Sequence, residues 1–270
     1  MKTFFTAVVL LSCFAARADR IVRSEISIKR APLQGKVKLM RYGSKTYYGN
    51  TDTISLKVSD LNYYAIDSFN DKGLKLYTRW MYNGINIENT LYTYDAKGNK
   101  IKEQQQAKDG TKGPEKTYTY DNVGNLIEEN ATSVQGVSLT KCTYSGGRKV
   151  TMQCPNVSLT TYSYNDKGQL SKEVSIFKQG NENSTLYTYD AQGRLASEEL
   201  RYGAKGKMAD ATRSTRYTYD EHNNEVLAEE SFNGKTEIRW TSKYVYDSHG
   251  NWLRCEGNGE VSVREIEYYP

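Results

Sequence analysis

A nine-residue stretch, YTYDAQGRL at positions 187–195, constrains the fold more than any other feature of the chain. Near-copies of it recur from about residue 69 almost to the C-terminus. The second aromatic residue of each copy falls at positions 69, 94, 120, 144, 164, 189, 219 and 246, which are 20 to 30 residues apart. A period of this length is typical of stacked supersecondary units, so we expect a repeat protein.

Each copy has the composition of a β-hairpin turn. Asp190 can accept backbone N–H bonds at the first turn position, and Gly193 can adopt the left-handed conformation that closes a type I turn with a bulge. Asn223 stands at the glycine position of a later copy, and asparagine tolerates the same conformation. The copies are therefore predicted to be hairpins.

The turn geometry also predicts which residues face each other across a hairpin. In the copy at 118–126 it pairs Tyr120 with Leu126, Thr119 with Ile127 and Tyr118 with Glu128. Because alternate residues of a strand share one face, each hairpin should have one tyrosine-rich face.

A second series of turn signals lies midway between the tyrosine motifs. It consists of Asn83-Gly84, Asp109-Gly110, Gln135-Gly136, Gln179-Gly180, Asn233-Gly234 and Asn258-Gly259. Strands of about 7 to 10 residues fit between the two series, and no window shows a helical apolar period. The predicted fold class is all-β, an antiparallel meander of repeated β-hairpins with about seventeen strands. At ~4.8 Å per strand such a sheet is ~80 Å wide, so we expect it to curl or partly close.

The N-terminus differs from the repeats. Met1 and Lys2 precede an apolar run, and residues 1–18 are typical of a secretory signal peptide. Lipidation at Cys13 is a second processing route. Residues 19–60 are predicted to form strands that cap a repeat array over residues 61–270. We therefore expect a secreted, periplasmic or cell-surface protein.

Composition argues against several functions. The net charge is +5, and basic and acidic residues are interspersed, which is not typical of a nucleic-acid-binding surface. Threonine alternates with tyrosine in the motifs, while Lys100, Glu128 and Arg254 fall on the tyrosine face. Neither face suits lipid, so the chain is predicted not to span a membrane. With 23 tyrosines and 6 phenylalanines, any core should be thin and aromatic.

Three cysteines follow the predicted leader: Cys142, Cys154 and Cys255. If Gly146-Gly147 is a two-residue turn, Cys142 faces Thr151, and Cys154 lies three residues out of register. This offset of ~10 Å exceeds the ~7 Å Cα separation that a disulfide tolerates without a bulge. The sequence leaves the disulfide state of these cysteines open.

The copies YTYDAQGRL, YTYDNVGNL and YVYDSHGNW resemble the YD repeat of the RHS family over about residues 67–270. The resemblance implies antiparallel hairpin ribbons that spiral into hollow shells. In bacterial toxins of this family the shell surrounds a C-terminal effector domain, and in related animal proteins the repeats are extracellular adhesion modules. Only 19 residues follow Asn251 here, so we expect a repeat-only member without a toxin domain.

Among the features of the sequence, the tyrosine columns are the best candidates for a ligand-binding surface. Tyrosines of neighbouring hairpins should align into a ladder of rings, whose main role is cross-strand packing. Where the ladder is exposed, its flat ring faces suit a sugar or a protein partner. The predicted ligand-binding residues are Trp80, Trp240, Trp252, Tyr187, Tyr189, Tyr217, Tyr219, Tyr244 and Tyr246.

No catalytic residue, metal or cofactor is predicted. His222 and His249 occupy the same turn position in adjacent copies, but hairpins repeat every ~9.6 Å, too far apart for both imidazoles to bind one zinc. The turn aspartates are needed as acceptors within their own turns rather than as calcium ligands. Neighbouring glutamates such as Glu198 and Glu199 point to opposite faces of a strand, so they cannot form a catalytic pair.

We therefore predict an exported, non-enzymatic repeat protein that binds a glycan or a surface protein at or outside the bacterial cell envelope. One alternative is a structural shell or scaffold, completed by self-association or by another repeat chain. A hydrolase is the third interpretation. The sequence leaves the identity of the ligand, the degree of sheet closure and the oligomeric state open.

Overall fold

The computed structural model describes residues 33–46, 55–133, 136–204 and 207–270. These residues form nineteen antiparallel strand segments and one 3-10 helix, Val58–Asp60. The strands are β1 (Val37–Thr46), β2 (Tyr63–Phe69), β3 (Lys75–Tyr82), β4 (Ile85–Tyr94), β5 (Lys100–Ala107), β6 (Lys112–Tyr120), β7 (Leu126–Ser133), β8 (Gly136–Ser145), β9 (Arg148–Cys154), β10 (Ser158–Tyr164), β11 (Leu170–Phe177), β12 (Asn181–Tyr189), β13 (Leu195–Ala204), β14 (Lys207–Tyr219), β15 (Glu225–Phe232), β16 (Lys235–Thr241), β17 (Lys243–Tyr246), β18 (Trp252–Gly257) and β19 (Glu260–Tyr268). The predicted all-β antiparallel meander is confirmed.

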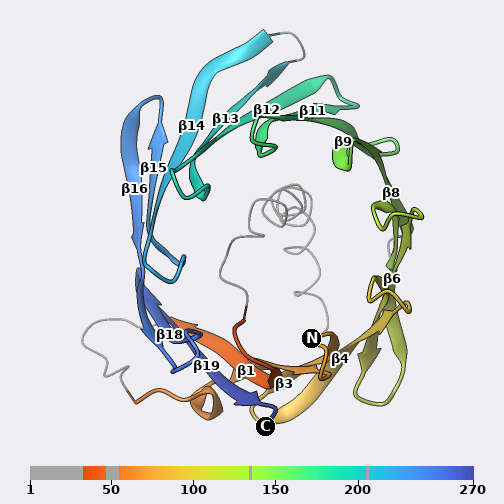
Figure 1. Ribbon diagram of the computed structural model, residues 1–270, viewed down its shortest axis with the longest axis vertical. Helices are drawn as coiled ribbons and strands as arrows, with labels where there is room; N and C mark the ends of the chain where they lie inside the picture. Colours follow the sequence, from red (N-terminus) through yellow and green to blue (C-terminus); the bar gives the residue numbers. More distant parts are fainter. Residues whose placement is uncertain (1–32, 47–54, 134–135, 205–206) are drawn as a thin grey trace, which may run out of the picture.

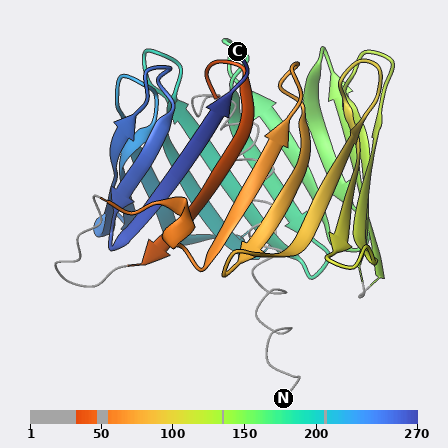
Figure 2. The same ribbon diagram turned by 90° about the horizontal axis from the view of Figure 1, so that it is seen from below.

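The sheet curls into a barrel-like ring (Figures 1 and 2). Successive strands lie side by side in chain order, and β1 pairs with both β2 and β19, so it joins the two ends of the array. Ser242 alone separates β16 from β17, which follow one path. Eight hairpins and β19 make the seventeen predicted strands, and β1 together with the break at Ser242 accounts for nineteen.

The structure does not test the predicted division of the chain into a signal peptide, a cap and a repeat array. Residues 1–18, including Cys13, lie outside the described residues, and the boundary near residue 60 stays a prediction. No helix in the described part of the chain is long and apolar enough to cross a membrane.

The first series of turns has the predicted geometry. Gly193 has a φ of +75°, and Asn223, at the equivalent position, has a φ of +63°. The Asp190 carboxylate accepts the backbone N–H of Arg194 at 2.8 Å. The local sequence therefore determines these turns, because aspartate supplies the acceptor and glycine or asparagine the left-handed backbone.

A β-bulge shifts the pairing that was predicted beyond the turn. Tyr120 faces Leu126, as predicted, but Thr119 faces Glu128 and Tyr118 faces Glu129, so the other two predicted pairs were wrong by one residue. In every copy of the motif the same shift lies between the second aromatic residue and the residue that precedes it. A bulge adds twist to a strand pair, which favours a curled sheet.

The bulge also changes which residue faces Cys142 across the hairpin. Cys142 faces Met152, not Thr151, although Gly146-Gly147 is the two-residue turn that the sequence predicted. Within the described residues, no disulfide joins Cys142, Cys154 or Cys255.

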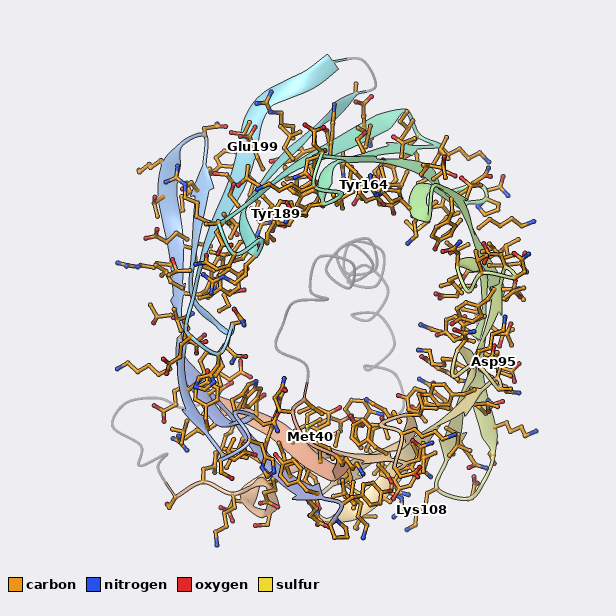
Figure 3. All side chains as sticks on the ribbon, viewed as in Figure 1. Met40, Asp95, Lys108, Tyr164, Tyr189 and Glu199 are labelled. Carbon is orange, nitrogen blue, oxygen red and sulfur yellow. The ribbon has the colours of Figure 1, made fainter. Side chains whose placement is uncertain are left out.

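The two faces of the sheet differ in chemistry. Tyr164 and Tyr189 point to the inside of the ring, whereas Glu199 points outward (Figure 3). The buried clusters are small and lie on the wall: one contains Met152, Tyr162, Leu170 and Tyr187, and the other Val58, Leu61, Val261 and Val263. The core is thin, as its composition suggested.

The turn aspartates should make stability depend on acid. Hydrogen bonds from the side chains of Asn99 and Asn125 lower the pKa of Asp95 and Asp121, respectively. A carboxylate with a lowered folded pKa stabilises the fold above its unfolded pKa of about 3.9, and this contribution is lost as the pH falls through the folded pKa. We expect the melting temperature to fall between about pH 5 and pH 2, and less steeply in an Asp95→Asn/Asp121→Asn double variant. Equal slopes in thermal melts of the two proteins would contradict this account.

Candidate functional site

The second tyrosine of each motif joins one hairpin to the next. In most copies its hydroxyl donates to a backbone carbonyl just after the preceding turn, whereas Tyr246 donates to the carboxylate of Asp220. The bonds to carbonyls are Tyr120 to Lys100 at 2.9 Å, Tyr144 to Leu126 at 3.0 Å, Tyr164 to Lys149 at 2.8 Å, Tyr189 to Leu170 at 2.8 Å and Tyr219 to Leu195 at 2.9 Å. The backbone pairing of β5 with β6 ends at Lys102 and Thr117. The Lys100 carbonyl therefore has no backbone partner on β6, and it accepts the tyrosine hydroxyl.

Basic side chains lie over many aromatic rings of the inner face. The charged group is between 3.4 and 5.9 Å from the ring centroid. The pairs are Lys75 with Phe69 and Tyr92, Lys100 with Tyr92 and Tyr118, Arg148 with Tyr164, Lys149 with Tyr162, Arg194 with Tyr219 and Arg264 with Trp252. Several aromatic rings of the inner wall therefore already have a cation–π partner within the protein.

Several of these bases also pair with an acid. Lys75 Nζ lies 2.6 Å from the carboxylate of Asp67, a residue that is only 2% exposed. Lys100 pairs with Glu103, and Arg194 Nε lies 2.7 Å from the Asp190 carboxylate. An aromatic ring, a base and an acid thus recur together as one packing unit.

The predicted tyrosines of the ladder belong to this packed wall. Tyr187 is 7% exposed and its hydroxyl lies 3.5 Å from Glu173. Burial and then Tyr164 raise the pKa of Tyr189 to about 12. The remaining four hydroxyls donate to Glu198 (Tyr217), the Leu195 carbonyl (Tyr219), the Glu225 carbonyl (Tyr244) and Asp220 (Tyr246). These contacts are structural, and ligand binding by the ladder stays a prediction.

The three predicted tryptophans have different surroundings. Arg264 lies 3.4 Å from the ring centroid of Trp252, and burial lowers the pKa of this arginine to about 10. Trp240 faces the buried Ala228 across β15 and β16. Trp80 stacks on Tyr63, with centroids 5.8 Å apart, and Tyr63 is 50% exposed. Trp80 is therefore beside an accessible aromatic surface.

The two histidines pack between hairpins. His222 lies against Tyr246 and His249 against Tyr268, each with ring centroids 4.0 Å apart. Within the described ranges no three histidine, cysteine or acidic side chains are grouped to hold a metal ion.

The well-exposed aromatic side chains lie outside the tyrosine motifs. Tyr63 is 50% exposed, Tyr82 51%, Tyr202 41% and Phe232 37%. All four are close to the second-turn rim, the end of the ring that carries the second series of turns, and strand alternation places them on the inner face. Sequence reasoning missed them, although Tyr82 and Phe232 directly precede Asn83-Gly84 and Asn233-Gly234.

An open cavity of about 340 Å³ lies at this rim, lined by Asn181, Asn183, Tyr202 and Gly203. Asn183 and Tyr202 face each other across β12 and β13. The pairing of β13 with β14 is irregular between Arg201 and Gly203, so Tyr202 has no paired residue on β14. Within the described residues, the side chains of Asn181, Asn183 and Tyr202 make no hydrogen bond with one another or with a neighbouring group.

Comparison with known proteins gives limited information. No protein-family model matches the sequence, and no curated protein matches it. A solved Tc holotoxin pore of Photorhabdus luminescens shares 19% identity over 79% of this chain and 12% of its own, with a TM-score of 0.37. A porin-like protein from Bacteroides uniformis shares 9% identity over 87% of this chain and 99% of its own, with a TM-score of 0.44.

The TcdB2-TccC3 structure shares 12% identity over 73% of this chain and 16% of its own, with a TM-score of 0.25. The chain thus spans only 12% of the matched chain in the Tc holotoxin pore and 16% of the matched chain in the TcdB2-TccC3 structure. Similarities at these scores carry no argument about what the chain binds or does.

Proposed function

We propose that this chain is an exported, non-enzymatic member of the RHS family that binds a glycan at or outside the cell envelope. The binding site is the cavity formed by Asn181, Asn183, Tyr202 and Gly203 at the second-turn rim. The observation that supports it is the combination of two carboxamides and an exposed aromatic ring around one cavity.

The chemistry of the cavity fits a saccharide. A carboxamide offers both a donor and an acceptor, and this matches neighbouring sugar hydroxyls, which need both. The ring of Tyr202 offers a flat apolar face to the C–H groups of a pyranose. Gly203 has no side chain, which leaves room for a ligand to approach the strand. A volume of about 340 Å³ is at the lower end for ligand pockets and suits one or two sugar units.

The placement of the acidic pairs supports a binding role rather than hydrolysis. Glu198 faces the inside of the ring and accepts a hydrogen bond from Tyr217, while Glu199 points outward (Figure 3). A retaining or inverting glycosidase needs two carboxyl groups that face one substrate. The proposed lectin-like function does not need such a pair of carboxyl groups.

Glycan binding should depend on Tyr202 and Asn183. We expect a glycan array probed with the purified protein to give hits, and titration calorimetry of a hit should show a Kd about tenfold higher for Tyr202→Ala. Asn183→Ala should weaken binding by a smaller factor, because one neutral hydrogen bond is worth about 1 kcal/mol. Phe232→Ala is the matched control, because it removes an exposed aromatic ring elsewhere on the same rim.

Two results would contradict the proposal. One is a silent array together with capture of a protein partner in pull-downs, which would favour protein binding. The other is a glycan affinity that Tyr202→Ala and Phe232→Ala change equally.

A further inference from the structure

The inner wall repeats one arrangement of three groups, which we term the covered-ring unit: an aromatic ring, a basic side chain over it and an acid paired with that base. Lys75 lies over Phe69 and pairs with Asp67, and Lys100 lies over Tyr92 and pairs with Glu103. In these units the chain itself supplies the cation.

Glu88 belongs to a unit in which no residue of the described part of the chain supplies the base. It faces Trp80 across β3 and β4, and Trp80 stacks on Tyr63. Within the described residues Glu88 forms no ion pair or hydrogen bond. Ala107 is its partner on β5, and the next residue, Lys108, points to the outside of the ring (Figure 3).

The Glu88 side chain is partly buried and thus partly shielded from water. Burial raises the pKa of Glu88, and after burial the charge of Glu88 is the cause that raises the pKa of Tyr63. Glu88 faces Trp80 across the strand pair, and the ring centroid of Trp80 lies 5.8 Å from that of Tyr63. An acid that is partly desolvated and unpaired is unfavourable, and a cation beside it would relieve that cost.

We propose that Tyr63, Trp80, Tyr82 and Glu88 form a binding site for a small organic cation of the alkylammonium class, such as a trimethylammonium group. The ligand takes the position that a lysine or arginine side chain holds in the covered-ring units. Tyr63 and Tyr82 face each other across β2 and β3, and both are about half exposed at the second-turn rim, so a ligand can reach the rings from solvent.

The chemistry favours an alkylated cation over a metal ion. Aromatic faces attract a cation most when it sheds water easily, and an alkylammonium group does so while its methyl groups pack on the rings. A single carboxylate with aromatic neighbours lacks the several oxygen ligands that calcium or magnesium needs. The site is separate from the glycan cavity, since it is built on β2 to β4 rather than on β12 and β13 (Figure 1).

Choline is the probe for this site, and 3,3-dimethylbutan-1-ol is its uncharged isostere. In titrations followed by tryptophan fluorescence, we expect choline to bind the purified protein and the neutral isostere to bind at least about tenfold more weakly. Glu88→Gln should raise the Kd for choline by about tenfold, whereas Glu237→Gln, which removes an exposed acid from β16, should leave it unchanged. Trp80→Phe should abolish most of the fluorescence response.

Equal binding of choline and the isostere would overturn the proposal, as would equal affinities of the Glu88→Gln and Glu237→Gln variants. Far-ultraviolet circular dichroism of each variant shows whether the ring is intact. The Glu88→Gln variant should keep its affinity for any glycan bound at Tyr202, so failure of one site leaves the other independently testable.

Discussion

Replacement of Tyr187 by alanine is expected to lower the free energy of unfolding by about 3 to 5 kcal/mol, as large-to-small changes of buried aromatic residues do. Tyr187 is 7% exposed and packs in one cluster with Met152, Tyr162 and Leu170. The wall has few aliphatic residues to fill the space that the ring leaves. Urea denaturation of the variant and the native protein measures the difference.

Two further variants separate packing from other effects. Leu186→Ala alters the neighbouring residue, which is 39% exposed on the outer face, and should cost less than about 1 kcal/mol. Tyr187→Phe keeps the ring and removes the hydroxyl, with its 3.5 Å contact to Glu173 and its hydrogen bond with the Thr185 side chain, so it should cost about 1 kcal/mol. A Tyr187→Ala variant as stable as Leu186→Ala would show that the ladder does not support the fold.

The second large effect is expected at Gly257, in β18. A Cβ atom at this position would lie 2.0 Å from the Thr241 carbonyl oxygen and 3.1 Å from its carbon. Both are backbone atoms, so no side-chain rotation relieves the contact, and the neighbouring strand must move. We expect Gly257→Ala to lower the free energy of unfolding by about 3 kcal/mol, the upper range for overpacking, in the same denaturation experiment.

Gly113→Ala is the matched control for this prediction. Gly113 also lies within a strand, β6, but an added Cβ would be 3.5 Å from its nearest neighbour, the Cβ of Gln105, which is an ordinary contact. A glycine within a strand weakens it, because glycine loses more backbone entropy on folding and has no side chain to pack, so this variant should be neutral or slightly more stable. Equal stabilities of the two variants would refute the close approach at Thr241.

Local turn chemistry made much of the fold predictable. Asp190 and Gly193 carry all that their turn requires, an acceptor and a left-handed backbone, and these properties do not depend on distant residues. The pairing of Tyr118 was predicted wrongly because the bulge adds one residue, Ile127, between the pairs Tyr120–Leu126 and Thr119–Glu128, and the turn residues alone do not signal it.

The candidate sites were less predictable than the turns. Trp80 was identified from its residue type, but Tyr63, Tyr82, Glu88 and Tyr202 were not. The tyrosine motifs, which stand out in the sequence, are packed because the preceding hairpin supplies a basic side chain over the ring, as Lys100 does for Tyr118, or a backbone carbonyl to the hydroxyl, as Leu170 does for Tyr189. Which aromatic residues remain exposed depends on partners from strands that are distant in sequence.

The sequence by itself determined the period of the repeat, the two series of turns and the tyrosine-rich face, because each follows from contacts within one hairpin. The tertiary structure alone decided that the sheet closes, through β1 between β2 and β19, and that the second-turn rim rather than the YTYDAQGRL ladder presents open aromatic rings. The physical reason is that curvature and burial arise from the accumulated twist of many strands. No single hairpin encodes them.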